Sequence, residues 1–411
     1  MSLTILSSDK TATTDPPING TPAPARPVEL KPALSWRAMA NVGISMLFHD
    51  RLKLLGTLLG VIFAVVLSNQ QGAIFFGLLS RNLLLQRNSG ADVWITPAAT
   101  EWTAPGELIP DSTVYQAKAM RDVEWASPIL VGAGNLKLPS GGTEAVQIIG
   151  VEMPDAHGGP WNVVAGRVQD LAQPDAFFFE DSDREKFGGL NLGSVRELNE
   201  HQVQAVGFTW GLIPFGPSYA FTSFDTAREI NHVDNHRVSF VLVKVRPGAD
   251  PAAVAAELQR RLPNQKVMTQ AQFEATTRSY LLTRTPLGMT FGTGAAFAFL
   301  VGFVIVALTM FSSVVDHIRQ FGTLKAIGAR TRDLAKLLAV QALAIALIGS
   351  IIGEGLVGLV LRRMRSPEMG LLLPSWMLLA TIGGMILLCL FASSLALLRL
   401  RRLEPGIVFR E

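Results

Sequence analysis

The stretch LLGTLLGVIFAVVL at residues 54–67 decides the fold of this chain. It is the apolar centre of a run between Lys53 and Arg81 that contains no charged side chain. A helix rises about 1.5 Å per residue and the hydrocarbon core of a bilayer is about 30 Å thick, so about 20 apolar residues can cross a membrane. The stretch therefore predicts a transmembrane helix, which we place at residues 54–80.

Three further apolar runs meet the same length criterion. They lie between Arg284 and Asp316, from Leu337 to Leu361, and from Met369 to Leu398. We predict spans at residues 286–315, 335–361 and 375–399, which makes four with the first. The first two are longer than a membrane requires, so we expect both helices to continue beyond it as a stalk.

The composition agrees with a membrane protein and excludes several functions. Hydrophobic residues make up 49% of the 411 residues and charged residues only 17%, against about 25% in soluble proteins. The net charge of +3 is too small to suggest a nucleic-acid partner. The only cysteine, Cys389, lies in an apolar run, so the chain can form neither an intrachain disulfide nor a cysteine-rich metal site.

The positions of Lys and Arg predict the orientation in the membrane. Basic residues gather in three segments, namely Arg37, Arg51 and Lys53; Arg319, Lys325, Arg330, Arg332 and Lys336; and Arg399, Arg401, Arg402 and Arg410. With four spans these segments share one side, which we predict to be the cytoplasm, together with both termini. A smaller basic set opposes this bias, namely Arg81, Arg87, and Arg362, Arg363 and Arg365 in the outer loop at residues 362–374.

The N-terminal region has two parts. Residues 1–33 are rich in Pro, Thr and Ala without an apolar centre, which predicts a disordered cytoplasmic tail and not a cleavable signal. Within residues 34–53, Trp36, Met39, Gly43 and Leu47 recur at helical spacing. They predict an amphipathic helix in the inner membrane interface, the alternative being an ordinary extension of the first span. Residues 400–411 are predicted to form a second cytoplasmic tail.

Residues 81–285 form a large domain outside the membrane, with stalk segments at its ends. Runs rich in β-branched and aromatic residues, bounded by turn residues, predict strands at 91–97, 145–152, 176–181, 202–208 and 238–245. Residues 249–262 predict a helix, because Asp250 can cap it and Pro251 suits its first turn. Strands mixed with a few helices imply an α+β domain.

This domain carries little that indicates chemistry. The motifs of serine hydrolases, zinc proteases and phosphate-binding loops are absent, so we predict no catalytic residue in this chain. Only His232 and His236 have ligand-like spacing, and Asn231, Asp234 and Asn235 around them indicate a turn. We therefore expect no metal site.

The apolar stretch FTWGLIPFGPSYAF at residues 208–221 contains Pro and Gly, which predicts a loop. Such a loop either packs on its own domain or offers an exposed contact to a partner or an amphiphilic substrate. The candidate contact residues are Phe208, Trp210, Phe215, Tyr219 and Phe221.

The third span contains an acid and several small residues. Glu354 is costly inside a membrane unless it is paired, and Arg362 or Arg363 could pair with it near the outer end. A proton-coupled role for Glu354 is the alternative. Gly349, Ser350, Gly353 and Gly358 are small enough to let helices approach closely.

The cytoplasmic segment at residues 316–334 is the most informative part. Gly322 and Gly328 bracket a short helical turn, which suits a small helix that docks into a groove of a cytoplasmic partner. Its sequence FGTLKAIGA (321–329) resembles the signature of the FtsX-like, or MacB-type, ABC transporter permeases. The C-terminal RLRRLEPGIVFRE (399–411) also resembles the ending of that family.

The resemblance extends along nearly the whole chain and is strongest to the DevC subfamily. NVGISMLFHDRLKLLGTLLGVIFAVVL (41–67) is similar to its entry into the first span, and residues 90–97, 123–142 and 146–152 are similar to its outer domain. Two features depart from the family. Gln320 stands where Glu is usual, which affects one polar contact to the ATPase, and the N-terminal tail is longer than expected.

The resemblance implies a fold and a mechanism. The fold is the type VII permease, with four spans and a periplasmic domain between the first two. The chain has no Walker A motif, so ATP and Mg²⁺ belong to a separate ATPase subunit, and two permeases pair with two ATPases. The residues expected to couple to the ATPase are Gln320, Phe321, Gly322, Thr323, Leu324, Lys325, Ala326, Ile327 and Gly328.

In such relatives, ATP-driven motion passes through the first two spans to the periplasmic domains. The implied function is export of an amphiphile or glycolipid from the bacterial inner membrane through a membrane-fusion protein and a TolC-like duct. A lipoprotein-release permease similar to LolC or LolE is one alternative. An FtsX-like transmitter that controls a cell-wall hydrolase is another, although its outer domain would be shorter.

Overall fold

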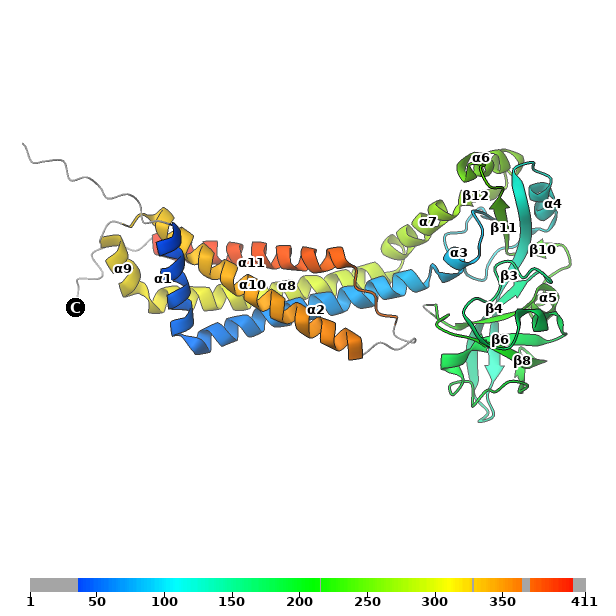
Figure 1. The fold of residues 1–411 in the computed structure, drawn as a ribbon, viewed down its shortest axis with the longest axis horizontal. Helices are drawn as coiled ribbons and strands as arrows, with labels where there is room; N and C mark the ends of the chain where they lie inside the picture. Colours follow the sequence, from blue (N-terminus) through cyan, green and yellow to red (C-terminus); the bar gives the residue numbers. More distant parts are fainter. Residues whose placement is uncertain (1–35, 215, 327–328, 364–369, 402–411) are drawn as a thin grey trace, which may run out of the picture.

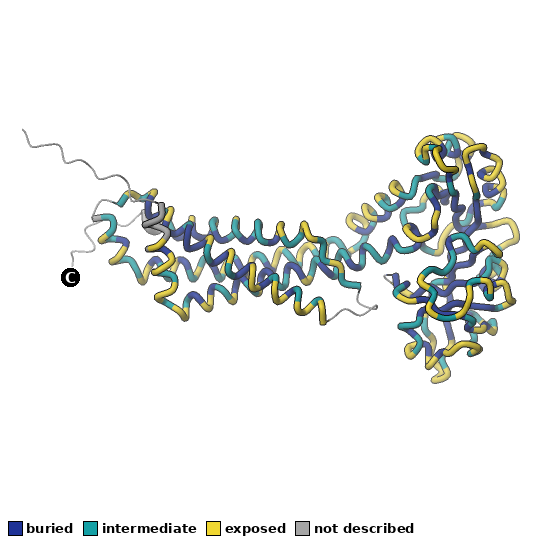
Figure 2. Tube along the Cα trace, in the orientation of Figure 1, coloured by how far each residue is buried: buried dark blue, intermediate teal, exposed yellow. Residues whose placement is uncertain are grey.

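The computed structural model describes residues 36–214, 216–326, 329–363 and 370–401. A long helical bundle occupies one end of the molecule and a domain rich in strands occupies the other, with a helical stalk between them (Figure 1). The buried residues therefore form two separate regions, one along the bundle axis and one inside the outer domain (Figure 2).

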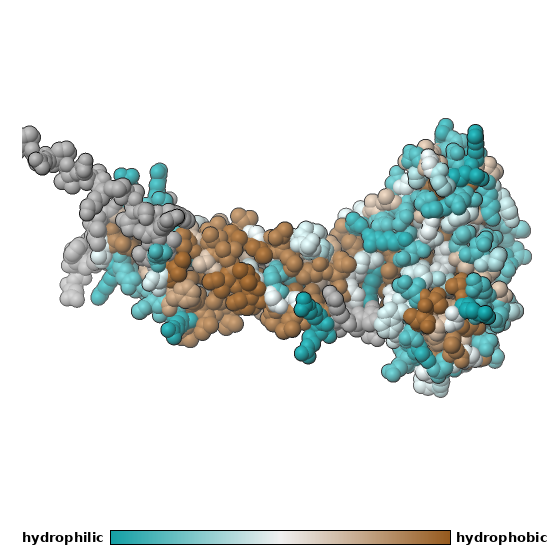
Figure 3. Space-filling model, viewed as in Figure 1, coloured by the Kyte–Doolittle hydropathy of each residue, from teal (hydrophilic) through white to brown (hydrophobic). Residues whose placement is uncertain are grey.

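Four helices form the bundle and confirm the four predicted spans. They are α2 (Arg51–Arg81), α8 (Pro286–Asp316), α10 (Thr331–Arg363) and α11 (Ser375–Arg401), and each is long and apolar enough to cross a membrane. Their outward faces carry large exposed apolar side chains such as Phe63, Phe297 and Leu387. The apolar surface covers the middle of the bundle, while the outer domain is mostly polar with a smaller apolar patch (Figure 3).

Small residues let α2 approach its two neighbours. A Cβ built on Gly302 of α8 would lie 2.6 Å from Cβ of Ala64 on α2, which is closer than real Cβ contacts. Gly349 and Gly353 of α10 meet Val61 and Val65 of α2 in the same way, which confirms their predicted role in close packing. A Cβ on Gly358 would meet no described atom within 4 Å, so no such approach is seen there within the described part of this chain.

The helix α1 (Trp36–His49) lies across the end of the bundle (Figure 1). Nε2 of Gln341 on α10 donates a 3.0 Å hydrogen bond to the carbonyl oxygen of Gly43, and Leu47 packs on the bundle core. The predicted helix within residues 34–53 is thereby confirmed, while its place in the membrane interface stays a prediction. Ile44 and Phe48 on its other side are exposed. The two predicted tails lie outside the described residues, apart from Arg401 and its neighbour at the end of α11.

The outer domain is built on one mixed sheet. Its described strands are β1 (Val93–Pro97), β3 (Val123–Lys137), β4 (Thr143–Val151), β5 (Val163–Ala165), β6 (Ala176–Glu180), β7 (Val195–Leu198), β8 (His201–Thr209), β9 (Ser218–Ser223), β11 (Phe240–Val245) and β12 (Gln265–Thr269). Their order is β12-β1-β11-β3-β4-β9-β6-β8-β5, with β7 beside β3 and β8. The strands β2 (Ile109–Pro110) and β10 (Arg237–Val238) form a separate pair.

Helices cover this sheet and connect it to the bundle. They are α3 (Leu84–Asn88), α4 (Ser112–Lys118), α5 (Phe224–Ile230), α6 (Pro251–Arg261) and α7 (Gln270–Thr283), with two short 3-10 turns at Val168–Ala172 and Asp181–Asp183. The prediction for α6 is confirmed, because the Asp250 side chain accepts a hydrogen bond from the Ala252 amide and Pro251 occupies the first turn. All five predicted strands are present, and the domain is α+β as expected.

Candidate functional site

The predicted coupling segment forms the short helix α9 (Ile318–Ala326), which follows α8 after a single residue. Gln320 and Thr323 are exposed on it, and Gly322, Leu324 and Lys325 are half-buried. These five residues therefore remain candidates for the contact with an ATPase. Ile327 and Gly328 lie outside the described residues, as does the side chain of Ala326.

Phe321 requires a correction. Its side chain is only 2% exposed and belongs to the same apolar cluster as Val314, Leu334 and Leu338 of the bundle. A buried ring cannot contact a partner in this conformation, so Phe321 attaches α9 to the bundle and is not a docking residue. The sequence motif shows an apolar residue at this position, but the direction in which it points depends on the packing of α9 against α8 and α10.

An ion pair joins the start of α2 to the end of α8. Asp50 caps the start of α2 by accepting a hydrogen bond from the Lys53 amide, and its carboxylate lies 3.0 Å from the Lys53 ammonium. The same ammonium binds Asp316, the last residue of α8. The hydrogen bond from Lys53 lowers the pKa of Asp50. The end of α8, where α9 begins, is thus fixed to the start of α2.

A polar cluster joins α2, α10 and α11 inside the bundle. Nδ2 of Asn69 donates a 2.9 Å hydrogen bond to Oε1 of Glu354, and the hydroxyl of Thr381 lies 3.1 Å from Oδ1 of Asn69. The predicted partners Arg362 and Arg363 form no ion pair with Glu354 in the described part of the chain. They follow Glu354 by eight and nine residues, about 12 Å along the helix, and this separation explains why the predicted ion pair does not form.

The apolar stretch at residues 208–221 also requires a correction. Phe208 lies on β8, and Tyr219 and Phe221 lie on β9, so the predicted loop is confined to the residues between these strands. All three side chains are buried in the domain, which excludes them as surface contacts. Trp210 is 45% exposed and remains a candidate contact, while Phe215 lies outside the described residues.

A buried carboxylate holds the start of this loop. Glu180, at the end of β6, accepts hydrogen bonds from the amides of Gly211 at 2.6 Å and Leu212 at 3.0 Å. The hydroxyls of Thr209 and Ser182 donate to it as well. Burial raises the pKa of Glu180, and these four donors act in the opposite direction. The sequence gives no signal for this contact, because its residues are distant in the chain.

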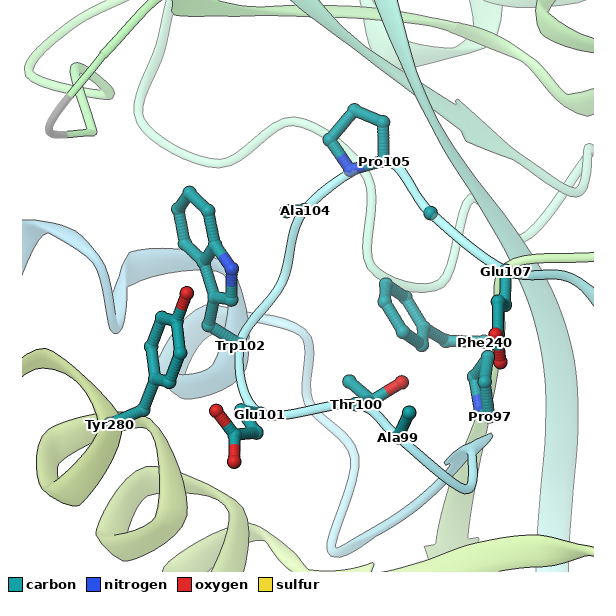
Figure 4. A pocket seen from close by; sticks show the side chains of 11 residues that line it. Pro97, Ala99, Thr100, Glu101, Trp102, Ala104, Pro105, Glu107, Phe240 and Tyr280 are labelled. Carbon is teal, nitrogen blue, oxygen red and sulfur yellow. The ribbon is translucent and has the colours of Figure 1, made fainter. Parts of the chain in front are cut away.

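Two cavities lie on either side of the segment that connects β1 to β2. The first has a volume of about 240 Å³ and is lined by Glu101, Trp102, Glu107, Phe240 and Tyr280, among others (Figure 4). The second has a volume of about 200 Å³ and shares Trp102, Ala104 and Pro105 with the first. Sequence reasoning missed both, because their walls come from elements that are distant in the chain. These are β1, β11 and α7 for the first cavity and β3, β4 and β9 for the second, together with several loops.

The histidines do not form a metal site in the described residues. No group of three His, Cys, Asp or Glu side chains is placed to hold an ion there. Nδ1 of His236 lies 3.2 Å from a carboxylate oxygen of Asp111. His157 stacks on Trp125 with ring centroids 3.8 Å apart, and burial lowers the pKa of this imidazole.

Models of known protein families match two parts of the chain. A model of the MacB-like periplasmic core domain matches residues 54–261, which are just over half of the 411 residues. A model of the FtsX-like permease C-terminal region matches residues 292–405, which contain most of α8, α9, α10 and α11.

Individual relatives match over shorter stretches. An uncharacterized ABC transporter permease of Methanocaldococcus jannaschii is 30% identical over 125 residues, which are 28% of this chain and 30% of that protein. Two uncharacterized ABC transporter permeases of Mycobacterium tuberculosis are 33% identical over 117 residues, which are 28% of this chain and 32% of theirs. The chain thus matches about a third of the length of these relatives.

Solved structures of periplasmic or extracellular domains resemble part of this chain. The periplasmic region of MacB from Actinobacillus actinomycetemcomitans is 13% identical and covers 46% of this chain and 94% of its own, with a TM-score of 0.35. The extracellular domain of the transporter YknZ from Gram-positive bacteria is 15% identical and covers 43% and 98%, with a TM-score of 0.33. The assignment therefore rests on the two family models. The resemblance to the DevC subfamily stays a prediction. From the matched residues 54–261 and 292–405, the chain belongs to the FtsX-like, MacB-type family of ABC transporter permeases.

Proposed function

We propose that this chain is the permease subunit of an ATP-driven exporter that works by transmitting motion along its helices. The observation that carries the proposal is the continuity of two helices. At one end of the bundle, α8 leads into α9 and the end of α8 pairs with the start of α2. At the other end, both α2 and α8 connect to the outer domain (Figure 1). Force applied to α9 would therefore reach the domain without crossing a flexible segment of more than a few residues.

The cytoplasmic end is built to move as a unit. Phe321 attaches α9 to the bundle core, and the Lys53–Asp316 ion pair connects the end of α8 to the start of α2. Gln320 and Thr323 remain exposed on α9 for an ATPase. When two ATPase subunits close on ATP, pressure on these side chains would displace α8 and α2 together.

The opposite end delivers this motion to a single edge of the sheet. The helix α2 leads through α3 into β1, and α8 is preceded by α7 and β12. β1 and β12 are antiparallel neighbours, with Val93 opposite Thr269.

Side chains connect the two arms of this stalk. Nε2 of Gln86 donates a 2.8 Å hydrogen bond to the Thr277 hydroxyl, and Arg87 lies 3.0 Å from Glu274. A displacement of either helix therefore acts on the same two strands.

The other subunits and the location follow from the family resemblance. We propose a homodimer in the bacterial inner membrane, with α9 and both termini in the cytoplasm and residues 81–285 in the periplasm. ATP and Mg²⁺ would bind to the ATPase, so this chain would carry no catalytic residue. The substrate would be an amphiphile or glycolipid, which passes to a membrane-fusion protein and a TolC-like duct. Membrane lipids contact the apolar faces of the four helices.

The test is a co-purification with the ABC ATPases of the same organism, followed by ATPase assays in lipid nanodiscs. We expect the permease to bind the ATPase and to change its activity, and the variant Thr323→Arg to lose both effects. Ser45→Arg is the matched control, because Ser45 is exposed on α1 at the same end of the bundle. Full binding and coupling by Thr323→Arg would contradict the role of α9.

The same preparation tests the tripartite arrangement. A membrane-fusion protein should bind the outer domain and alter the ATPase activity. If it does neither, the exporter assignment fails. Binding of a lipoprotein chaperone would then favour lipoprotein release, and binding of a cell-wall hydrolase would favour signal transmission.

A further inference from the structure

The cavity beside the stalk combines aromatic faces with carboxylates. Trp102 and Tyr280 lie side by side at one wall, with ring centroids 6.4 Å apart and an interplanar angle of 20° (Figure 4). Phe240 and Glu107 lie at the other wall, and Glu101 lies on the same side as Trp102 and Tyr280. The volume of about 240 Å³ can hold a small organic group.

The charge of the lining points to a cation. Glu101 and Glu107 are its only charged members, and neither forms an ion pair or a side-chain hydrogen bond in the part of the chain that the structure describes. The ammonium group of Lys266 donates to the carbonyl oxygen of Thr100, and Lys266 is not part of the lining. Aromatic faces attract cations, and quaternary ammonium groups are bound in proteins by such aromatic surroundings.

The segment that carries these residues is held in place before any ligand arrives. The Thr277 hydroxyl donates a 3.0 Å hydrogen bond to the carbonyl oxygen of Glu101, and Nε2 of Gln147 donates to that of Thr103 at 3.1 Å. Thr103 is buried. A site fixed in this way loses little conformational freedom on binding.

We propose that this cavity binds an alkylammonium group, either the head of a membrane lipid or that of a free amphiphile. This inference deepens the proposed export function. It rests on that function only for the role of the ligand in export, because binding itself can be measured without an ATPase. Tyr280 lies on α7, six residues before the start of the apolar helix α8, so the site lies on the stalk. An ammonium group bound there contacts the stalk that joins α8 to the sheet.

Binding is tested on the full chain in nanodiscs made of phosphatidylglycerol, which lacks an amine. The probe is choline, its control ligand is the neutral carbon isostere dimethylbutanol, and the signal is saturation transfer from the protein to the ligand methyl groups. We expect choline to bind more tightly than the isostere. Glu101→Gln and Trp102→Leu should each weaken choline binding by about fivefold to tenfold, since each removes one cation contact.

Glu185→Gln is the matched control, because Glu185 is exposed elsewhere on the outer domain and lines neither cavity. Thermal unfolding of each variant shows that the domain remains folded, and Tyr280→Phe, which keeps the aromatic face, should bind choline like the parent. Equal binding of choline and the isostere would overturn the proposal. Unchanged choline binding by both Glu101→Gln and Trp102→Leu would overturn it as well.

Nanodiscs that contain phosphatidylethanolamine distinguish the two sources of the ligand. Competition between this lipid and choline identifies a lipid head as the occupant, and choline binding without competition identifies a free amphiphile. Both results support an alkylammonium site. Because the permease is measured alone, a failure of this proposal is distinct from a failure of ATP-driven export.

Discussion

Replacement of Phe321 by alanine should release α9 from the bundle. The ring is 2% exposed within the bundle core, and a buried Phe→Ala change typically costs about 3–5 kcal/mol. Each 1.4 kcal/mol corresponds to a tenfold change in an equilibrium, so the undocked population of α9 should rise by roughly a hundredfold or more. A helix of nine residues is not stable alone in water, so undocking should also unfold it.

Hydrogen exchange on the purified permease, without an ATPase, measures this effect. The amides of α9 should exchange roughly a hundredfold faster in Phe321→Ala than in the parent, while those at the centre of α2 remain protected. Phe321→Leu should lie between the two, because it keeps much of the apolar volume. Thr323→Ala, which changes an exposed side chain of the same helix, should alter exchange by much less.

The result that would refute this reasoning is unchanged protection of α9 in Phe321→Ala. The side chain would then contribute nothing to the permease alone, and a direct contact with the ATPase would be the better account. Loss of ATPase binding without any change in exchange would support the same conclusion.

Three further predictions address the bundle and the outer domain. Gly302→Val should push α8 away from α2 at a cost of about 1–3 kcal/mol, and a melting temperature equal to that of the parent would contradict the close approach seen here. Glu354→Gln should melt like the parent, because an amide oxygen can still accept from Asn69, whereas Glu354→Leu should melt lower by the equivalent of about 1–2 kcal/mol. An equal fall of the melting temperature in both variants would indicate that the charge of Glu354, and not its hydrogen bond, stabilises the bundle. His157 has a pKa lowered by burial, so its stabilising effect is complete above its unfolded value of 6.5 and is lost as the pH falls below that value towards the folded pKa. The melting temperatures of the parent and of His157→Gln should therefore differ less at about pH 5 than at about pH 8. A difference that stays constant with pH would show that this imidazole does not titrate as described.

Local sequence patterns predicted the helices that depend on residues close together in the chain. The four spans follow from the absence of charge over lengths that a membrane requires, and α6 follows from Asp250 and Pro251 at its start. The long strand β3 was missed as a strand, because Pro128, Gly132 and Gly134 interrupt its pattern. The structure shows a close approach at Gly132, where a Cβ would lie 2.2 Å from the side chain of Asn231 at the end of α5.

The features of the candidate site that depend on distant residues were not predictable from spacing. Lys53 and Asp316 are 263 positions apart, and Asn69 and Glu354 are 285 positions apart. The inward direction of Phe321 is also a consequence of packing, since a short amphipathic helix can place an apolar residue either on its own protein or on a partner. The sequence predicted a short helix in this segment, which the structure has, but only the fold separates its buried side from its exposed face.

The central claim is that the nucleotide state at α9 changes the position of the outer domain. Cys389 is the only cysteine and is buried, so Cys389→Ser provides a background in which Gln202→Cys, exposed on β8, carries a single spin label per chain. Electron–electron distance measurements between the labels of two copies, with the ATPase bound, should give different distributions in the nucleotide-free and ATP-trapped states. The difference should vanish in Thr323→Arg. Identical distributions in the two states of the parent complex would contradict the account.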